Sequence, residues 1–138
     1  MDHTAETLLD AIERVRETDG RYSREAYLFL VAALGHAVDQ LPQARRADPV
    51  RRHLVGREVI AAMLELAGME FGPLAATVFT EWGVTRGRDV GEIVFQLVTA
   101  GQLSTQPEDC IEDFDLPGDL LTGLSASRES RKHLRGPA

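Results

Sequence analysis

Apolar residues recur at helical spacing along most of this 138-residue chain, and that periodicity constrains its fold more than any other feature. The clearest stripe runs through Val90, Ile93, Val94, Leu97 and Val98 and ends at a glycine. Similar stripes between turn or cap residues predict four more helices, at about 4–16, 24–41, 56–67 and 73–82. The arginine- and proline-rich residues 42–53 have little to bury and predict a surface loop. The sequence therefore predicts a mainly α fold.

The order of the elements over residues 54–116 is typical of a winged-helix domain: helix, turn, short helix, turn, amphipathic helix and hairpin. The expected hairpin is a pair of short extended pieces on either side of the turn at 106–109. We predict a small helical domain over residues 1–116, winged-helix-like over 54–116 with a short C-terminal β-hairpin and preceded by two helices. The alternative is a five-helix bundle that the C-terminal segment crosses. Residues 117–138 are expected to form a flexible tail.

Several segments resemble a known family. They are RYSREAYLFLVAAL (21–34), GRE (56–58), FGPLAATVFTEWGV (71–84), GEIVFQLVTAGQLS (91–104) and EDF (112–114). Together they resemble the Minf family of short bacterial proteins, over about two thirds of the chain. The resemblance implies a bacterial origin and one domain. The family has no established biochemical activity, so the resemblance assigns no catalytic residue. The helix before Arg21 and the arginine-rich loop 44–52 depart from the family pattern.

The formal net charge of −7 is unevenly distributed. Residues 53–115 carry three arginines against eleven carboxylates, whereas the loop and the C-terminal tail are basic. A domain that reads duplex DNA needs positive charge where the duplex lies. The expected third helix and wing are acidic, which argues against duplex DNA binding by this domain. The basic loop and tail are the places where nucleic acid would bind.

The sequence shows no constellation of residues typical of an enzyme, a metal site or a cofactor site. Cys110 is the only cysteine and lies among carboxylates, which should raise its pKa. The four histidines lie far apart in the sequence, and no GxSxG or phosphate-binding loop is present. We therefore expect no catalytic residues, no metal and no cofactor. Gly91 is expected to permit close helix packing, and Trp82 to pack in the core.

We predict a non-enzymatic protein–protein interaction module whose partner contacts the third helix, with Arg86, Arg88, Glu92 and Gln96 as exposed contact residues. The alternative is a nucleic-acid-binding or regulatory protein that contacts phosphates through the basic tail and four loop arginines: Arg45, Arg46, Arg51 and Arg52. The amphipathic first helix permits a homodimer. A cytoplasmic location is expected, because the N-terminus shows no secretory signal and no uninterrupted apolar run reaches the ~18–20 residues of a membrane span.

Overall fold

The computed structural model describes residues 6–107, 109–115, 120–122 and 124, and all regular structure within those ranges is helical. Its elements are α1 (Leu8–Thr18), α2 (Arg24–Asp39), α3 (Gln43–Arg46), α4 (Gly56–Phe71), the 3-10 helix η1 (Gly72–Leu74), α5 (Ala75–Trp82), α6 (Gly87–Thr99) and the 3-10 helix η2 (Ile111–Phe114). Residues 120–122 and 124 also have helical backbone. The prediction of a mainly α fold is confirmed.

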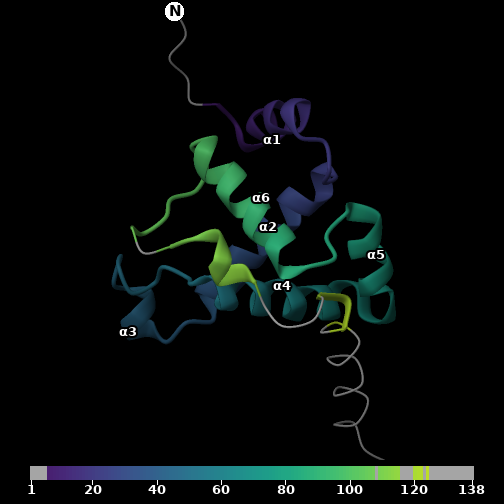
Figure 1. Cartoon of the computed structure of the whole chain (residues 1–138). Helices are drawn as coiled ribbons and strands as arrows, with labels where there is room; N and C mark the ends of the chain where they lie inside the picture. The colour runs from purple at the N-terminus through teal and green to yellow at the C-terminus, as the bar shows by residue number, and fades with distance from the viewer. Residues whose placement is uncertain (1–5, 108, 116–119, 123, 125–138) are drawn as a thin grey trace, which may run out of the picture.

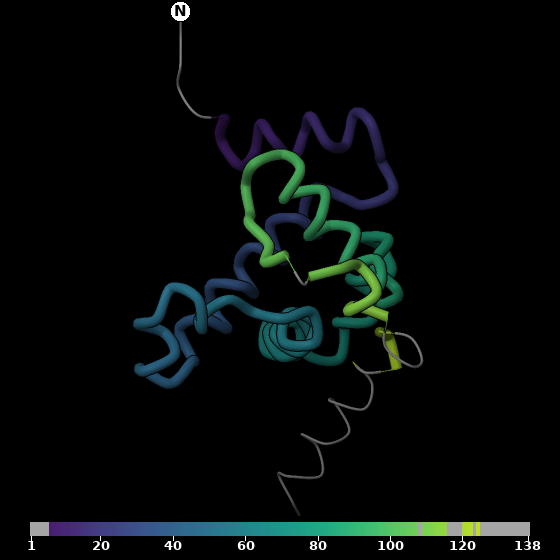
Figure 2. The backbone as a smooth tube through the Cα atoms, turned by 60° about the vertical axis from the view of Figure 1, so that its left-hand side comes forward, coloured from purple at the N-terminus to yellow at the C-terminus, as the bar shows by residue number. Residues whose placement is uncertain are grey.

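The helices pack in layers around one core. The α4 helix lies along one side of the molecule and α1 along the opposite side, with α2 and α6 between them (Figures 1 and 2). The most extensive contact between two helices joins α2 to α4, and α6 touches α1, α2 and α4. The largest fully buried side chains come from all these layers: Ile12, Tyr22, Tyr27, Leu30, Ile60, Met63, Phe79, Ile93 and Leu97. Burial of these apolar stripes is the main force that holds the short helices together.

The helix ends follow the sequence signals closely. Gly83 follows α5 with a φ of 85°, and Gly101 lies just beyond α6 with a φ of 80°, so both use the left-handed conformation that glycine allows. The start of α6 is capped by a side chain from within the helix. There the Asp89 carboxylate accepts hydrogen bonds from the backbone N–H groups of Thr85 and Arg86, each at 3.0 Å. An acid at the third helical position thus satisfies the donors that precede the helix.

The predicted surface loop 42–53 contains one helical turn, α3, directly after Pro42. The turn is held by its own backbone hydrogen bonds and by the Arg45 side chain, which reaches to the backbone carbonyl of His53 at 3.1 Å. Because α3 buries none of its residues, apolar periodicity could not predict it.

The predicted C-terminal β-hairpin is wrong. Within the described residues, the first expected strand is irregular chain and the second is the 3-10 helix η2. The backbone groups that a hairpin would pair across strands are satisfied locally. The Gln106 N–H donates to the Asp109 carboxylate at 2.7 Å, and the Cys110 N–H donates to the Asp113 carboxylate at 3.1 Å. These two aspartates favour turns and caps over a ladder, and without its wing the winged-helix-like interpretation of residues 54–116 is also wrong.

Three glycines let η2 pack tightly against α4 and α6. A Cβ atom on Gly56 would lie 2.9 Å from the Asp113 carbonyl oxygen, and one on Gly87 would lie 2.3 Å from the Phe114 carbonyl oxygen. A Cβ on Gly91 would lie 2.8 Å from the Phe114 ring. The expectation that Gly91 permits close packing is therefore confirmed, although its neighbour is η2 and not another long helix. Phe114 is 5% exposed and packs edge-on against Phe95.

The helical run from α4 through η1 to α5, Gly56–Trp82, is long and apolar enough to cross a membrane by length and composition alone. Core helices of soluble proteins meet the same criterion. The run is also bent. Gly72 takes a φ of 51° in front of Pro73, and α5 turns away from the line of α4 (Figure 1).

Of the predicted tail 117–138, only residues 120–122 and 124 lie among the described residues. Leu120 and Leu124 are buried, and the Leu120 N–H donates to the Thr85 carbonyl at 2.9 Å. Leu120 therefore lies beside the chain that leads into α6.

Candidate functional site

The four residues predicted to contact a partner all lie on α6 or its N-cap, but they do not form one free surface. Arg86 has a 63% exposed side chain, 3.6 Å from the Asp89 carboxylate. Arg88 faces the η2 segment, where its Nη1 atom lies 2.8 Å from Asp115 Oδ2. The guanidinium of Arg88 therefore joins α6 to the chain that follows η2.

Glu92 and Gln96 face α2 and the turn that joins α1 to α2. The Tyr22 hydroxyl donates to Glu92 at 2.9 Å, and the Tyr27 hydroxyl donates to Gln96 Oε1 at 2.6 Å. The Gln96 amide in turn donates to Asp19 at 2.9 Å. Both side chains are therefore committed to internal contacts between α6 and the N-terminal helices.

These contacts belong to a buried polar network around Asp89. Burial alone would raise the pKa of Asp89, but hydrogen bonds from the Thr85 N–H, the Tyr22 hydroxyl and the Arg86 N–H together lower it. The pKa of Tyr22 is raised, by burial and by hydrogen bonds to Asp89 and Glu92. The network thus keeps an ionised carboxylate and a neutral phenol in the protein interior, where they fix the start of α6 against the turn between α1 and α2.

Two of the four loop arginines are also engaged. Arg45 makes a bidentate pair with Glu58 of α4, at 2.7 and 2.8 Å, and this pair lowers the pKa of Glu58 to about 2. Arg46 donates to the Asp39 carbonyl at 3.1 Å. Arg51 and Arg52 are exposed, and their side chains have no partner among the described residues. The loop therefore offers two free guanidinium groups, and the basic residues of the tail lie outside the described residues.

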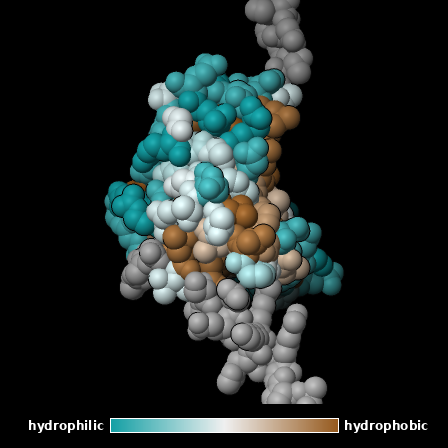
Figure 3. Space-filling model, turned by 90° about the vertical axis from the view of Figure 1, so that its right-hand side faces the viewer, coloured by the Kyte–Doolittle hydropathy of each residue, from teal (hydrophilic) through white to brown (hydrophobic). Residues whose placement is uncertain are grey.

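The strongest candidate for a contact surface is apolar and was not predicted. We call it the α4–α5 face and define it by Phe29, Met69, Phe71, Leu74 and Trp82. Met69 and Leu74 are 58% and 63% exposed, while the three aromatic side chains are half-buried between α2, the end of α4 and α5. Figure 3 shows hydrophobic side chains gathered around α5, below the hydrophilic region over α1. An exposed apolar patch of this kind commonly marks an interaction site.

The aromatic rings of the α4–α5 face form one connected cluster. The Phe29 ring centre lies 5.4 Å from that of Phe71 and 5.3 Å from that of Trp82. Phe71 and Trp82 meet edge to face at 5.6 Å and 82°. The buried ring of Phe79 stacks beneath Trp82 at 5.5 Å. These packed rings provide a pre-organised platform beside the exposed Leu74.

Carboxylates, and no basic side chains, accompany this face along the chain. Residues 59–85 contain Glu65, Glu70 and Glu81, all exposed, and neither lysine nor arginine. The apolar pattern does not reveal this face, because Leu74 fits the spacing of Val78 and Trp82, which predicts a buried residue. The sequence feature that could have revealed it is Pro73, because a proline at the start of a helix places the next residue, Leu74, in the first helical turn.

Comparison of the chain with protein-family models, with curated proteins and with solved structures found no match. The resemblance to the Minf family therefore stays a prediction. Among the described residues, no group of three or more His, Cys, Asp or Glu side chains is placed to hold a metal ion.

Proposed function

We propose that this chain is a non-enzymatic protein-interaction module. Its α4–α5 face binds an amphipathic segment of a partner protein, in which lysines or arginines flank the apolar side chains. The observation that carries the proposal is the exposure of Met69 and Leu74, which lie on either side of Phe71 in the chain, together with the packed aromatic cluster of Phe29, Phe71 and Trp82.

The size and rigidity of the apolar side chains support this surface. Complete burial of a leucine or methionine side chain is worth about 1.5–3 kcal/mol, and more than half of each of these two side chains is still exposed. Each therefore has about 1–2 kcal/mol to gain from a partner. The aromatic rings are already ordered by their mutual packing, so binding would not need to freeze them.

The charge around the face specifies the kind of partner. The stretch 59–85 supplies four of the five face residues and carries Glu65, Glu70 and Glu81 without lysine or arginine. This negative charge favours a partner with complementary positive charge. Such charges mainly speed association and select the partner, while the apolar contacts supply most of the affinity. This surface takes the place of the third-helix surface, because Arg88, Glu92 and Gln96 are held in internal contacts.

Selection from a library of displayed random 16-residue peptides tests the proposal. Immobilised protein should enrich peptides with helically spaced apolar residues and flanking lysines or arginines. Binding of an enriched peptide should fall about tenfold or more in Leu74→Asp. The matched control is Val50→Asp, at an apolar position in the loop before α4 that is 68% exposed; it should bind as the unsubstituted protein does.

Enrichment of acidic peptides, or equal binding by Leu74→Asp, would contradict the proposal. Sedimentation equilibrium tests whether the chain forms a homodimer through this face. A dimer of the unsubstituted chain that dissociates in Leu74→Asp would assign the face to a second copy and overturn the partner named here.

A second candidate function, nucleic-acid binding through the arginine loop and the tail, has the exposure of Arg51 and Arg52 in its favour. Filter binding with single-stranded and duplex DNA at low salt tests it. Replacement of both arginines by serine should weaken phosphate-driven binding and reduce its salt dependence by about two counterions. Affinity that is unchanged in the double variant would exclude the loop as the contact.

A further inference from the structure

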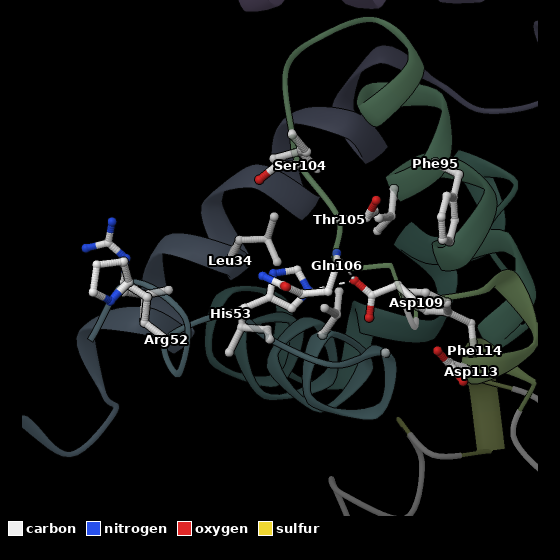
Figure 4. A pocket seen from close by; sticks show the side chains of 17 residues that line it. Leu34, Arg52, His53, Phe95, Ser104, Thr105, Gln106, Asp109, Asp113 and Phe114 are labelled. Carbon is white, nitrogen blue, oxygen red and sulfur yellow. Dashed lines mark hydrogen bonds and ion pairs between the residues drawn. The ribbon is translucent and has the colours of Figure 1, made fainter. Parts of the chain in front are cut away.

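A cavity of about 380 Å³ lies on the side of the molecule away from the α4–α5 face. It is open to solvent on one side and is lined by α2, the loop before α4, the first turns of α4, α6, residues 103–106 and 109, and η2 (Figure 4). Its volume falls in the range of small-molecule sites in proteins. Its wall is mostly apolar, formed by Leu34, Val38, Leu54, Val59, Val94, Phe95, Leu103 and Phe114.

The polar edge of this cavity is organised around one pair. His53 Nε2 lies 2.7 Å from Asp109 Oδ2, and this same oxygen accepts the Gln106 N–H at 2.7 Å (Figure 4). The His53 and Asp109 side chains are only 22% and 12% exposed. Two hydrogen bonds therefore fix the Asp109 carboxylate, which in turn fixes the orientation of the imidazole.

This arrangement determines the hydrogen-bonding character of His53. An ionised carboxylate only accepts hydrogen bonds, so the proton of a neutral imidazole beside Asp109 belongs on Nε2. The other nitrogen, Nδ1, then has a lone pair and acts as an acceptor. It has no hydrogen-bond partner among the described residues. The cavity thus combines an apolar wall with an imidazole of fixed orientation and the carboxylates of Asp109 and Asp113.

We propose that this cavity binds a small uncharged aromatic alcohol, with its rings against the apolar wall and its hydroxyl donating to His53 Nδ1. The described charged residues that line it are Arg52, Asp109 and Asp113 besides His53. Their formal charges add up to −1 when the imidazole is neutral, so the lining does not favour an anionic ligand. A dry apolar cavity of ~150 Å³ accommodates benzene. The present volume therefore has room for two fused rings.

Binding of 2-naphthol, followed by its fluorescence or by titration calorimetry at about pH 8, tests the proposal. The matched ligand is 2-methoxynaphthalene, which has the same rings but no hydroxyl donor. We expect saturable one-to-one binding of 2-naphthol, and binding of the methoxy compound that is about 3- to 10-fold weaker, the effect of one hydrogen bond.

Two variants separate the hydrogen bond from the cavity. His53→Phe should bring the affinity for 2-naphthol down to that for the methoxy compound. Thr105→Trp places a large ring at an exposed position on the cavity lining, where it has little influence on folding, and should abolish binding of both compounds. Leu74→Asp lies on the other surface and should leave both affinities unchanged, so this inference is independent of the proposed partner site.

Absence of saturable 2-naphthol binding would overturn the proposal, as would equal affinity for the two compounds. A His53→Phe variant that binds 2-naphthol as tightly as the unsubstituted chain would also contradict it. Circular dichroism and thermal unfolding of each variant establish that it is folded before binding is measured.

Discussion

Replacement of Gly91 by alanine is a sharp test of how η2 is held on α6. In an exposed helix interior this change is favourable by ~1 kcal/mol, because glycine loses more backbone entropy than alanine. At Gly91 the new methyl group would lie 2.8 Å from Cγ and Cδ2 of Phe114 and 3.0 Å from its Cβ. These distances are about 1 Å shorter than a comfortable carbon–carbon contact.

The expected magnitude follows from the two opposing effects. Overpacking of a well-packed contact destabilises by about 1–3 kcal/mol, and the crowded atoms are the root of the Phe114 ring and cannot swing away easily. After subtraction of the helix-propensity gain, we expect Gly91→Ala to lower the free energy of unfolding by up to about 2 kcal/mol. Full release of Phe114 would raise the loss to about 3–5 kcal/mol, the range for deletion of a buried phenylalanine.

The matched control is Gly35→Ala in α2. Gly35 is exposed, and a Cβ there would meet nothing within 4 Å. This variant should gain about 0.5–1 kcal/mol. Urea unfolding followed by circular dichroism and Trp82 fluorescence measures both. In a Phe114→Ala background the loss at Gly91 should shrink, because the contacts with Cγ and Cδ2 are gone and only the 3.0 Å contact with Cβ remains. If the Gly91→Ala variant has the same free energy of unfolding as the Gly35→Ala variant, the reasoning is refuted.

Two further predictions concern charged and polar groups. The pKa of Glu58 is depressed in the folded protein to about 2, so its pair with Arg45 stabilises above pH 4.5 and is lost as the pH falls toward 2. In thermal unfolding, the stability of Glu58→Gln should therefore depend less on pH in the acid range. At neutral pH the variant should lose about 1 kcal/mol in free energy of unfolding after allowance for solvent screening. An unchanged pH dependence would exclude the pair as a source of stability. Tyr22→Phe removes the hydroxyl whose single proton is shared between Asp89, at 2.7 Å, and Glu92, at 2.9 Å, and it should destabilise by about 1–2 kcal/mol in urea unfolding. A variant of unchanged stability would show that the network does not depend on the phenol.

The long helices and their ends were predictable because local signals and burial agree. The stripe of Val90, Ile93 and Leu97 is fully buried, and Gly83 ends α5 as its sequence position suggests. The hairpin was not predictable from apolar pattern alone. Asp109 and Asp113 redirect the backbone through side-chain hydrogen bonds, and alternation of apolar residues does not report such bonds.

The candidate sites were harder to predict than the fold. The sequence predicts that Arg45 is an exposed basic residue of the loop, but Arg45 pairs with Glu58, which lies thirteen residues further along the chain. His53 and Asp109 are separated by 56 residues, and only tertiary structure brings them together. Leu74 has the spacing of a buried residue yet lies beside the bend at Gly72, where its side chain is left outside the core. Long-range pairing and the direction of a bend leave no trace in local periodicity.

The most direct test of the proposed function is the affinity of a selected basic amphipathic peptide for three forms of the full chain, measured by titration calorimetry. We predict that Leu74→Asp weakens binding about tenfold or more, while Val50→Asp, an equally exposed apolar position elsewhere, binds within about twofold of the unsubstituted protein. Equal affinities for all three forms would contradict the assignment of the α4–α5 face as the partner site.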